Sequence, residues 1–478
     1  MSTSNPPTAA TPALTLDTLA GALAATPGAD EWQAEITTTR EIQRYVIGAE
    51  DESARAVTSE RARVRVLNDH PAHGATEAAA AGEANAETAD GAPAQARGWS
   101  TVTVLATDAA DPARLAARLG DATFMAGLTD NPPYHLPGMP AGGFPAVETV
   151  DPELAGPDPF ERQAERALQA ARDELERAIA AEPGVRLSSA ELYLSRETRT
   201  LRNSHGLACA GEGTHVFLDA ILIASDGTHE AEVHVEQGRR RLSDLQIGAT
   251  IRAYAGYARD TLRAATPPTL RGPVVISGSS LSDLLGPLVF HASAQAKFLG
   301  ISRFAPGELV TSASPRGDRL SLATDATLPY GARTARCDAE GVPGARVALV
   351  EDGVLRAYWA EQRYAQYLDV PATGAVANLV VGLGETATAD FWGGEPVYEI
   401  VDFSWMNPDP ITGEFASEIR LGYRHDPDGT VTPIKGGTLA GNVFEALAGV
   451  RFAREALFTG NYYGPAAMRF EELSIAGE

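Results

Sequence analysis

The feature that most constrains the fold is the alternation of apolar and polar residues at every second position in several long stretches of the chain. Such stretches cover residues 61–67, 99–106, 191–201, 215–224 and 228–237. A side-chain period of two is typical of strands that bury one face. Helical spacing is confined to isolated stretches, chiefly residues 14–25, 160–179, 247–264, 284–298 and 438–454. Runs of strands interrupted by isolated helices predict an α+β fold.

The chain has 478 residues, and we expect two domains. The first is an N-terminal α+β domain, residues 1–185, which ends after the helix that stops at Pro183-Gly184. The second is a β-rich domain with a few helices, residues 186–478. Residues 69–97 are dominated by Ala, Glu, Gly and Thr, so they cannot bury enough apolar surface to fold alone. We predict that they form a disordered insertion at a hairpin tip.

The charge balance excludes several functional classes. The chain has 39 Lys and Arg residues against 63 Asp and Glu residues, a formal net charge of −24. A nucleic-acid-binding protein needs a basic surface to release counterions, and the densest basic run, Arg239-Arg240-Arg241, is expected to be a solvated strand end. No stretch of 18 apolar residues predicts a membrane span. Residues 1–12 do not resemble a signal peptide, which favours a cytoplasmic protein.

Metal ligands are scarce in this sequence. Cys209 and Cys337 are the only cysteines, so a thiolate zinc knuckle is excluded, and we interpret both as small buried or loop thiols. A metal site would have to use the nine histidines and the carboxylates. His291 falls in a predicted helix rich in Leu, Phe and Ala, where a single histidine is typically a packing residue.

Two strings imitate catalytic or cofactor motifs. His229-Glu230-Ala-Glu-Val-His234 reads H-E-x-x-x-H, but it follows a Ser-Asp-Gly turn in an alternating run. On a strand, residues five apart point to opposite faces, so we expect that His229 and His234 do not bind the same metal ion. Gly382-Leu-Gly384-Glu-Thr-Ala387 matches the dinucleotide fingerprint, but no helix follows it, and we predict a loop.

Three other segments carry a family resemblance. They are Arg202–Gly206, with Asn203 and Gly206; the stretch from Asn407 that includes Thr412 and Gly413; and the stretch from Pro433 that ends with Gly441 and Asn442. From about residue 187 onward the chain resembles the TldD/PmbA family, the so-called modulator of DNA gyrase proteins. Residues 64–67 and 134–137 resemble it more weakly.

The resemblance implies a member of a metallopeptidase family whose subunits pair around a chamber that admits unfolded peptides. The TldD-type subunit carries H-E-x-x-x-H on a helix, with a C-terminal cysteine as third zinc ligand; the TldE/PmbA-type subunit lacks these ligands. In the matching stretch here, His291 is retained, but Ala292 and Ala296 replace the glutamate and the second histidine. Residues 460–478 contain no cysteine. The chain therefore resembles the metal-free TldE/PmbA-like subunit, without catalytic, cofactor or metal residues of its own.

The resemblance thus implies a cytoplasmic subunit of a TldD–TldE-type peptidase that processes or degrades unfolded peptides. A TldD-like partner would supply zinc and the general base in a heterodimer, and this chain an exposed strand edge for the substrate backbone. Two alternatives stay open: a zinc metallopeptidase in its own right, using His291 or His229 and His234, and a non-enzymatic peptide-binding homodimer. The sequence leaves open whether this chain is itself an enzyme.

Overall fold

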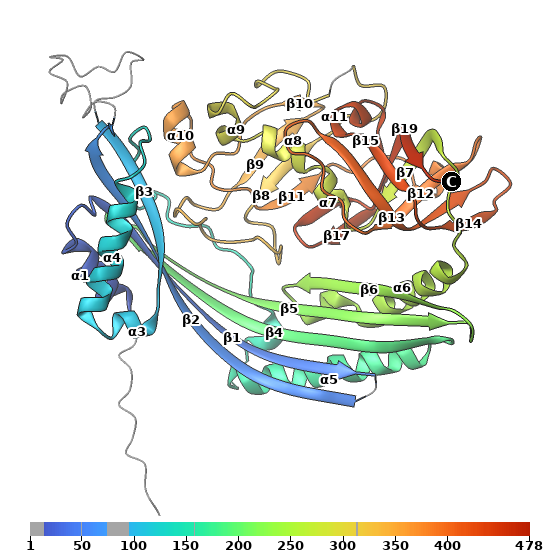
Figure 1. Ribbon diagram of the computed structural model, residues 1–478, viewed down its shortest axis with the longest axis horizontal. Coiled ribbons are helices and arrows are strands. Elements are labelled where there is room, and N and C mark those ends of the chain that lie inside the picture. The colour runs from blue at the N-terminus through green and yellow to red at the C-terminus, as the bar shows by residue number, and fades with distance from the viewer. Residues whose placement is uncertain (1–13, 49, 74–94, 157, 312–313) are drawn as a thin grey trace, which may run out of the picture.

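The computed structural model describes residues 14–48, 50–73, 95–156, 158–311 and 314–478. These residues form a long curved sheet and a more compact β-rich part that lies above it in Figure 1. The α+β fold predicted from the sequence is confirmed. Among the helices described, none is both long enough and apolar enough to cross a membrane.

The long sheet has six antiparallel strands in the order β3-β2-β1-β4-β5-β6. Its strands are β1 (Glu31–Ile47), β2 (Glu50–Pro71), β3 (Gln95–Val104), β4 (Val185–Asn203), β5 (Ala208–Ser225) and β6 (Glu230–Arg239). One end is covered by α1 (Leu16–Ala24), α3 (Ala106–Ala109) and α4 (Pro112–Ala126), and the other by α5 (Phe160–Ala180) and α6 (Ile247–Arg263). Figure 1 shows these two helical groups at opposite ends of the curved strands.

The alternation in the sequence explains which face of this sheet is buried. On β5, Leu218, Ala220 and Leu222 are fully buried, because they pack against the apolar stripe of α5 and α6. On β6, Ala231, Val233 and Val235 are buried, while Glu232 and His234 between them stay exposed. The other end has its own core, formed by α1, α4 and strands β1–β3.

The long sheet crosses the domain boundary expected at 185/186. β1 pairs with β4 from Gln33–Asn203 to Ile47–Ser189, so strands on both sides of that boundary share one ladder. The architecture changes only after α6. The ends of the insertion predicted at 69–97 are also ordered, because Asp69 pairs with Arg97 in the β2–β3 ladder. Its middle, residues 74–94, lies outside the described residues.

Five strands of the C-terminal part form a closed sheet. β12 (Val397–Phe403) pairs with β7 (Leu270–Ser277), β7 with β19 (Ala467–Ala476), β19 with β15 (Thr438–Asn442), β15 with β13 (Glu414–His425), and β13 again with β12. β14 (Val431–Ile434) and β16 (Arg451–Phe452) attach to β13 and β19. Because the sheet closes on itself, these five strands leave no edge open between them.

A second sheet packs on the closed one, with the order β10-β9-β8-β11-β18-β17. Its strands are β8 (Leu322–Asp325), β9 (Arg346–Glu351), β10 (Val354–Leu355), β11 (Asn378–Val381), β17 (Ala456–Thr459) and β18 (Tyr462–Pro465). One large core lies between the two sheets. The short helices are α7 (Leu281–Leu284), α8 (Gly286–His291), α9 (Ala294–Phe298), α10 (Gln362–Leu368) and α11 (Val443–Ala446).

The helix predicted at residues 438–454 is wrong. Residues 438–442 form β15, and only Val443–Ala446 is α-helical. Gly441 packs where a Cβ would lie 2.5 Å from Leu473 and 3.0 Å from Phe415, so its strand position fits glycine alone. Asn442 then caps α11 by accepting from the Phe444 and Glu445 N–H groups. The apolar residues of this stretch are buried in a core. Because a buried strand can have the same apolar residues as a buried helix, their spacing alone did not distinguish the two.

The expectation of a solvated Arg239–Arg241 run is also wrong. Arg240 is half-buried, and its guanidinium donates to the carbonyl oxygens of Gly331, Ala332 and Thr334 at 3.3, 3.0 and 3.1 Å. Arg239 donates to Phe458 O, and Arg241 stacks over Tyr330. The run therefore fastens the end of β6 to the C-terminal part.

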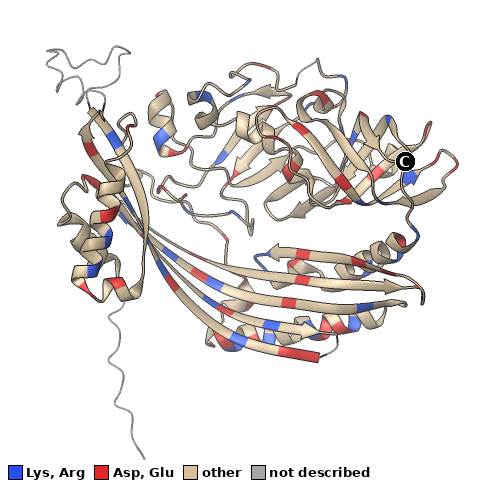
Figure 2. Cartoon of the chain, in the orientation of Figure 1, with Lys and Arg blue, Asp and Glu red and all other residues tan. Residues whose placement is uncertain are grey.

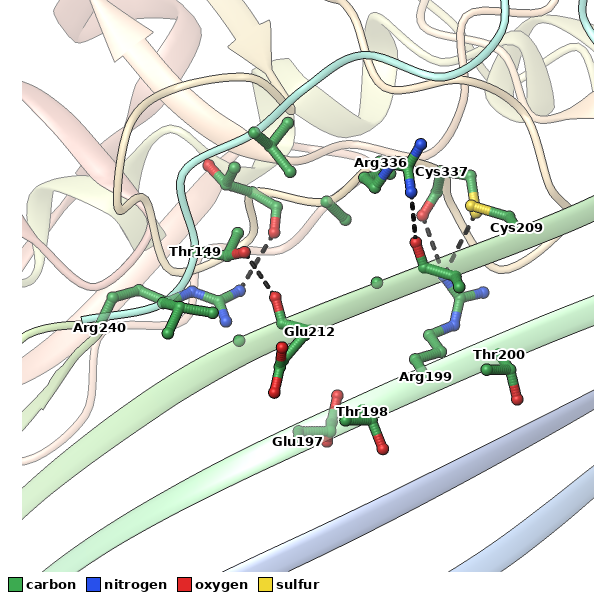
Figure 3. A pocket seen from close by; sticks show the side chains of 17 residues that line it. Thr149, Glu197, Thr198, Arg199, Thr200, Cys209, Glu212, Arg240, Arg336 and Cys337 are labelled. Atoms are coloured by element: carbon green, nitrogen blue, oxygen red, sulfur yellow. Dashed lines mark hydrogen bonds between the residues drawn. The ribbon is translucent and has the colours of Figure 1, made fainter. Parts of the chain in front are cut away.

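The same segment, residues 331–340, which we call the clamp segment, is held from three further strands. Arg199 of β4 donates to Cys337 O at 3.0 Å and to Asp338 O at 2.7 Å. Gln33 of β1 donates to Ala339 O at 2.7 Å, and Arg65 of β2 pairs with Glu340 at 2.6 Å. Figure 3 shows Arg199 and Arg240 reaching from the long sheet toward this segment. The two parts are thus joined mainly by guanidinium groups that donate to backbone carbonyls, with one amide donor and one ion pair.

We predict that Arg240→Ala lowers the free energy of unfolding by about 3 kcal/mol, since buried carbonyls lose a charged donor. Arg186→Ala is the matched control, because that side chain is 56% exposed and contacts Glu230 at the surface; it should cost under about 1 kcal/mol. Urea unfolding of both variants measures the difference. Equal losses would contradict a clamping role for Arg240.

Candidate functional site

The structure places the stretch that resembles the family's metal helix across two short helices. His291 ends α8, Ala292 follows it, and Ala296 lies in α9. The chain breaks between the helices because Ser293 caps α9 by accepting from the Ala296 N–H at 2.9 Å. His291, Ala292 and Ala296 are all completely buried. The position therefore lies inside the core.

Both ring nitrogens of His291 are bonded to the backbone. Nδ1 accepts from the Arg303 N–H at 3.1 Å, so Nε2 carries the proton and donates to Ile411 O at 2.9 Å. The rings of Phe290, Phe304 and Phe444 surround the imidazole. Burial lowers the pKa of His291, which favours the neutral ring.

This environment does not fit a zinc ion. A zinc ligand needs a free nitrogen lone pair, and the only lone pair of this tautomer already accepts a hydrogen bond. Neither Ala292 nor Ala296 offers a second ligand or a general base. The residues at this position can pack and orient the loops around them, but they cannot activate a water molecule.

Four of the family-motif residues gather beside His291. Thr412 and Gly413 follow Ile411, and β13 then pairs with β15 so that Phe415 lies opposite Gly441. Asn442 donates from Nδ2 to Thr412 O at 2.9 Å. Gly413 has φ +78°, and a Cβ there would lie 2.6 Å from the Phe444 ring. These motif residues therefore build the turn that presents Ile411 O to His291.

The other two motif residues lie elsewhere, in the turn between β4 and β5. Asn203 is buried, and its Oδ1 accepts from the His205 and Leu207 N–H groups at 3.0 and 3.1 Å. Its Nδ2 donates to Pro137 O at 2.7 Å, which fastens the turn to residues 134–137. Gly206 takes φ +75°, the left-handed conformation that this turn requires.

A polar cluster that the sequence analysis missed lies at this turn. The Glu31 carboxylate is buried and contacts His135 Nδ1 at 2.5 Å, His205 Nε2 at 2.9 Å and Arg97 Nη1 at 2.7 Å. Burial would raise the pKa of Glu31, but hydrogen bonds from the Leu136 N–H, His135 and Arg97 hold it below its usual value. A signal was present, since both resembling segments, 134–137 and 202–206, contain a histidine.

The H-E-x-x-x-H string does not form a metal site. Most of it lies on β6, where Glu230, Glu232 and His234 are exposed on one face, as the alternation predicts. His234 Nε2 contacts Asp219 at 2.7 Å on the neighbouring strand. His229 precedes the strand with its side chain 76% exposed and contacts Asp226 in the turn. The two histidines thus contact different aspartates and do not face a common site.

The glycine string at 382–387 is a loop, as predicted. It follows β11, and the next helical residues form only a short 3₁₀ turn, Thr388–Phe391. Gly384 lies against the Phe452 backbone, where a Cβ would be 1.9 Å from the carbonyl oxygen. This glycine permits close packing of two backbones.

The two cysteines are buried neighbours, free of a disulfide, at the junction of the long sheet and the clamp segment. A hydrogen bond between the two thiols, together with Arg199 and Arg336, lowers the pKa of Cys209. The same hydrogen bond and burial raise the pKa of Cys337. They line a pocket of 590 Å³ with Glu197, Glu212 and Arg240 (Figure 3). The guanidinium groups here donate to carbonyls of the protein itself.

Comparison with known proteins agrees with this architecture. The family described as the PmbA/TldA metallopeptidase C-terminal domain matches residues 269–477. "Metalloprotease PmbA" of Escherichia coli is 24% identical over 70% of this chain and 73% of its own length. An uncharacterized protein of Methanocaldococcus jannaschii is 29% identical over 51% of this chain, and the alignment spans 59% of that relative's length.

Solved structures share the fold along nearly the whole chain. TldE from Thermococcus kodakarensis superposes with a TM-score of 0.75 at 18% identity, covering 96% of this chain and 99% of that one. A Thermotoga maritima structure gives the same TM-score and identity, covering 97% of this chain and 100% of its own. The fold and the C-terminal match define a metallopeptidase-type architecture. Residues 269–477 match the TldD/PmbA family, and the fold is similar to that of TldE.

We predict that His291→Ala destabilises the protein by about 3 kcal/mol, because it leaves a cavity among three aromatic rings and removes the partner of two backbone groups. The matched control is His229→Ala, at an exposed position, which should change the free energy of unfolding by less than about 0.5 kcal/mol. Chemical denaturation compares the two variants. A stability loss at His229 as large as that at His291 would contradict the packing role.

The lowered pKa of His291 also predicts a pH dependence. The unfolded chain takes up a proton at His291 near pH 6.5, whereas the folded chain takes it up only at lower pH. The stabilising contribution of His291 to the unfolding free energy is therefore full above about pH 6.5 and declines below it. His291→Gln keeps a donor and an acceptor but does not titrate. Between pH 7.5 and 5.5, the unfolding free energy should therefore fall more in wild type than in His291→Gln. Parallel pH profiles would refute this assignment.

Proposed function

We propose that this chain is the TldE/PmbA-type subunit of a two-chain metallopeptidase that processes or degrades unfolded peptides. A TldD-like partner supplies zinc and the general base. This chain supplies half of the substrate-binding surface.

The environment of His291 is the observation that carries the proposal. The only histidine at the family's metal position has both ring nitrogens bonded to backbone atoms, and alanines occupy the other two positions. A peptidase needs a positioned base and an open ligand position on its metal. This position offers neither, which favours a partner chain as the source of both.

A groove between the two parts supports a role in peptide binding. It has a volume of 800 Å³ and lies between β5 and β6 on one side and strands β12 and β13 on the other; its lining includes Ile221, Glu232, His234, Asp402, Arg420 and Lys435. Within the described residues, β6 is an edge strand that pairs only with β5. An extended peptide can add to such an edge through main-chain hydrogen bonds, which suits substrates without fixed sequence.

Charge and cysteine chemistry agree with a cytoplasmic peptide-binding role. Figure 2 shows basic and acidic residues intermingled along the strands of the long sheet, in a chain of net charge −24. Direct nucleic-acid binding is disfavoured by this balance. Cys209 and Cys337 are neighbours without a disulfide, the state that a reducing compartment maintains.

Reconstitution tests the proposal. The purified chain should not cleave an unfolded casein substrate, whereas mixing it with a TldD-like protein of the same organism should produce cleavage that a chelator abolishes. His291→Gln should retain this activity in the mixture within about twofold, since the ring takes no part in chemistry. Cleavage by this chain alone that the chelator abolishes would contradict the proposal.

Two further outcomes assign the alternatives. If Glu230→Gln removes activity from the lone chain without unfolding it, the chain is a peptidase in its own right. If the chain forms a homodimer that binds peptide and no TldD-like protein confers cleavage, it is a non-enzymatic binding protein.

A further inference from the structure

Three clusters of ionisable side chains in the described residues bring three possible metal-ligand atoms within 4.8 Å of one another. The clusters are Glu31 with His135 and His205, Asp219 with His234 and Glu236, and Asp130 with His70 and His73. They lie on different elements from His291. Their surroundings decide which of them suits a metal ion.

The Glu31 cluster already contains its cation. Arg97 Nη1 lies 2.7 Å from Glu31 Oε1 and 3.2 Å from His135 Nδ1, where it occupies the space that an ion would need. The Leu136 N–H holds the other Glu31 oxygen at 2.8 Å. The Asp219 cluster has a single imidazole on an exposed strand face. A site with one nitrogen ligand on a solvated surface binds transition metals weakly.

The Asp130 cluster is different because two imidazoles converge on one carboxylate oxygen. His70 Nε2 lies 3.1 Å and His73 Nδ1 2.7 Å from Asp130 Oδ1. The second oxygen, Oδ2, is held by the His73 N–H at 2.9 Å. The residues come from the end of β2, from the segment just after it, and from the connector after α4. Among the hydrogen bonds and ion pairs of the described residues, no guanidinium or ammonium group contacts these three side chains.

The two nitrogens of His70 both face acceptors. Nε2 faces Asp130 Oδ1, and Nδ1 lies 3.3 Å from Asn68 O. A neutral imidazole has one proton and cannot donate to both. When Nδ1–H donates to the carbonyl, the Nε2 lone pair and the carboxylate need a positive charge between them, which a second ring proton or a bound metal ion supplies. Donation from the outer nitrogen to a backbone carbonyl is also the usual arrangement of a metal-bound histidine.

We propose that His70 Nε2, His73 Nδ1 and Asp130 form a binding site for one divalent transition-metal ion of the zinc class. Two imidazoles and a carboxylate are a ligand set that this class prefers. The His73 side chain is 57% exposed, so an ion can enter from solvent and water can complete its coordination. The bound ion would tie the end of the β2–β3 hairpin to the connector at Asp130. This site is independent of the proposed peptidase role.

Metal titration of the full chain tests the site. After treatment with a chelator and dialysis, wild type should take up one Zn²⁺ per chain by elemental analysis, with the affinity measured by calorimetry. His73→Ala and Asp130→Asn should each weaken zinc binding at least about tenfold. His135→Ala, which removes an exposed imidazole from the neighbouring Glu31 cluster, should change it less than about twofold.

Co²⁺ provides an independent readout, because its visible absorption reports nitrogen and oxygen ligands directly. Wild type and His135→Ala should show the same Co²⁺ spectrum, and His73→Ala should lose it while its circular dichroism stays unchanged. Undiminished zinc binding in folded His73→Ala or Asp130→Asn would overturn the proposal. So would loss in His135→Ala alone, or absence of stoichiometric uptake by wild type.

Discussion

Half-buried arginines that donate to backbone carbonyls hold the two parts of this protein together. The clamp segment, residues 331–340, is contacted by side chains from β1, β2, β4 and the end of β6. Arg240 donates to three of its carbonyls, and burial lowers the pKa of this arginine. A charged hydrogen bond in such an environment is worth about 1.5–3 kcal/mol. Because the clamp fixes the C-terminal part over the long sheet, it also fixes the groove between them.

The histidines show how environment decides the role of one residue type. His291 is enclosed by aromatic rings, and each of its ring nitrogens is hydrogen-bonded to a backbone group. Its role is therefore to pack in the core. His135 and His205 both contact Glu31, whose negative charge is already paired with the guanidinium of Arg97. His70 and His73 meet one carboxylate oxygen with no cation contacting it among the described residues. The same side chain thus packs, neutralises charge or offers ligands, according to what surrounds it.

Sequence patterns predicted much of the fold, because strand alternation is a local property that burial on one face enforces. The α+β class, the exposed face of β6 and the loop at 382–387 were predictable in this way. The strand at 438–442 was not, since its apolar spacing also fits a helix and the contacts that decide it come from Phe415 and Leu473. Arg239–Arg241 and the Asp69–Arg97 pair depend on partners far along the chain. No local pattern reveals such contacts.

The proposed function depends on His291 being neutral, with both ring nitrogens hydrogen-bonded. Histidine-selective ¹H–¹⁵N NMR measures this state directly, since the two ring nitrogens report their protonation separately. We predict a neutral His291 ring with the proton on Nε2, a hydrogen-bonded Nδ1, and signals that do not move when zinc is added. A zinc-dependent shift of either ring nitrogen of His291, or a charged ring at pH 7, would contradict it.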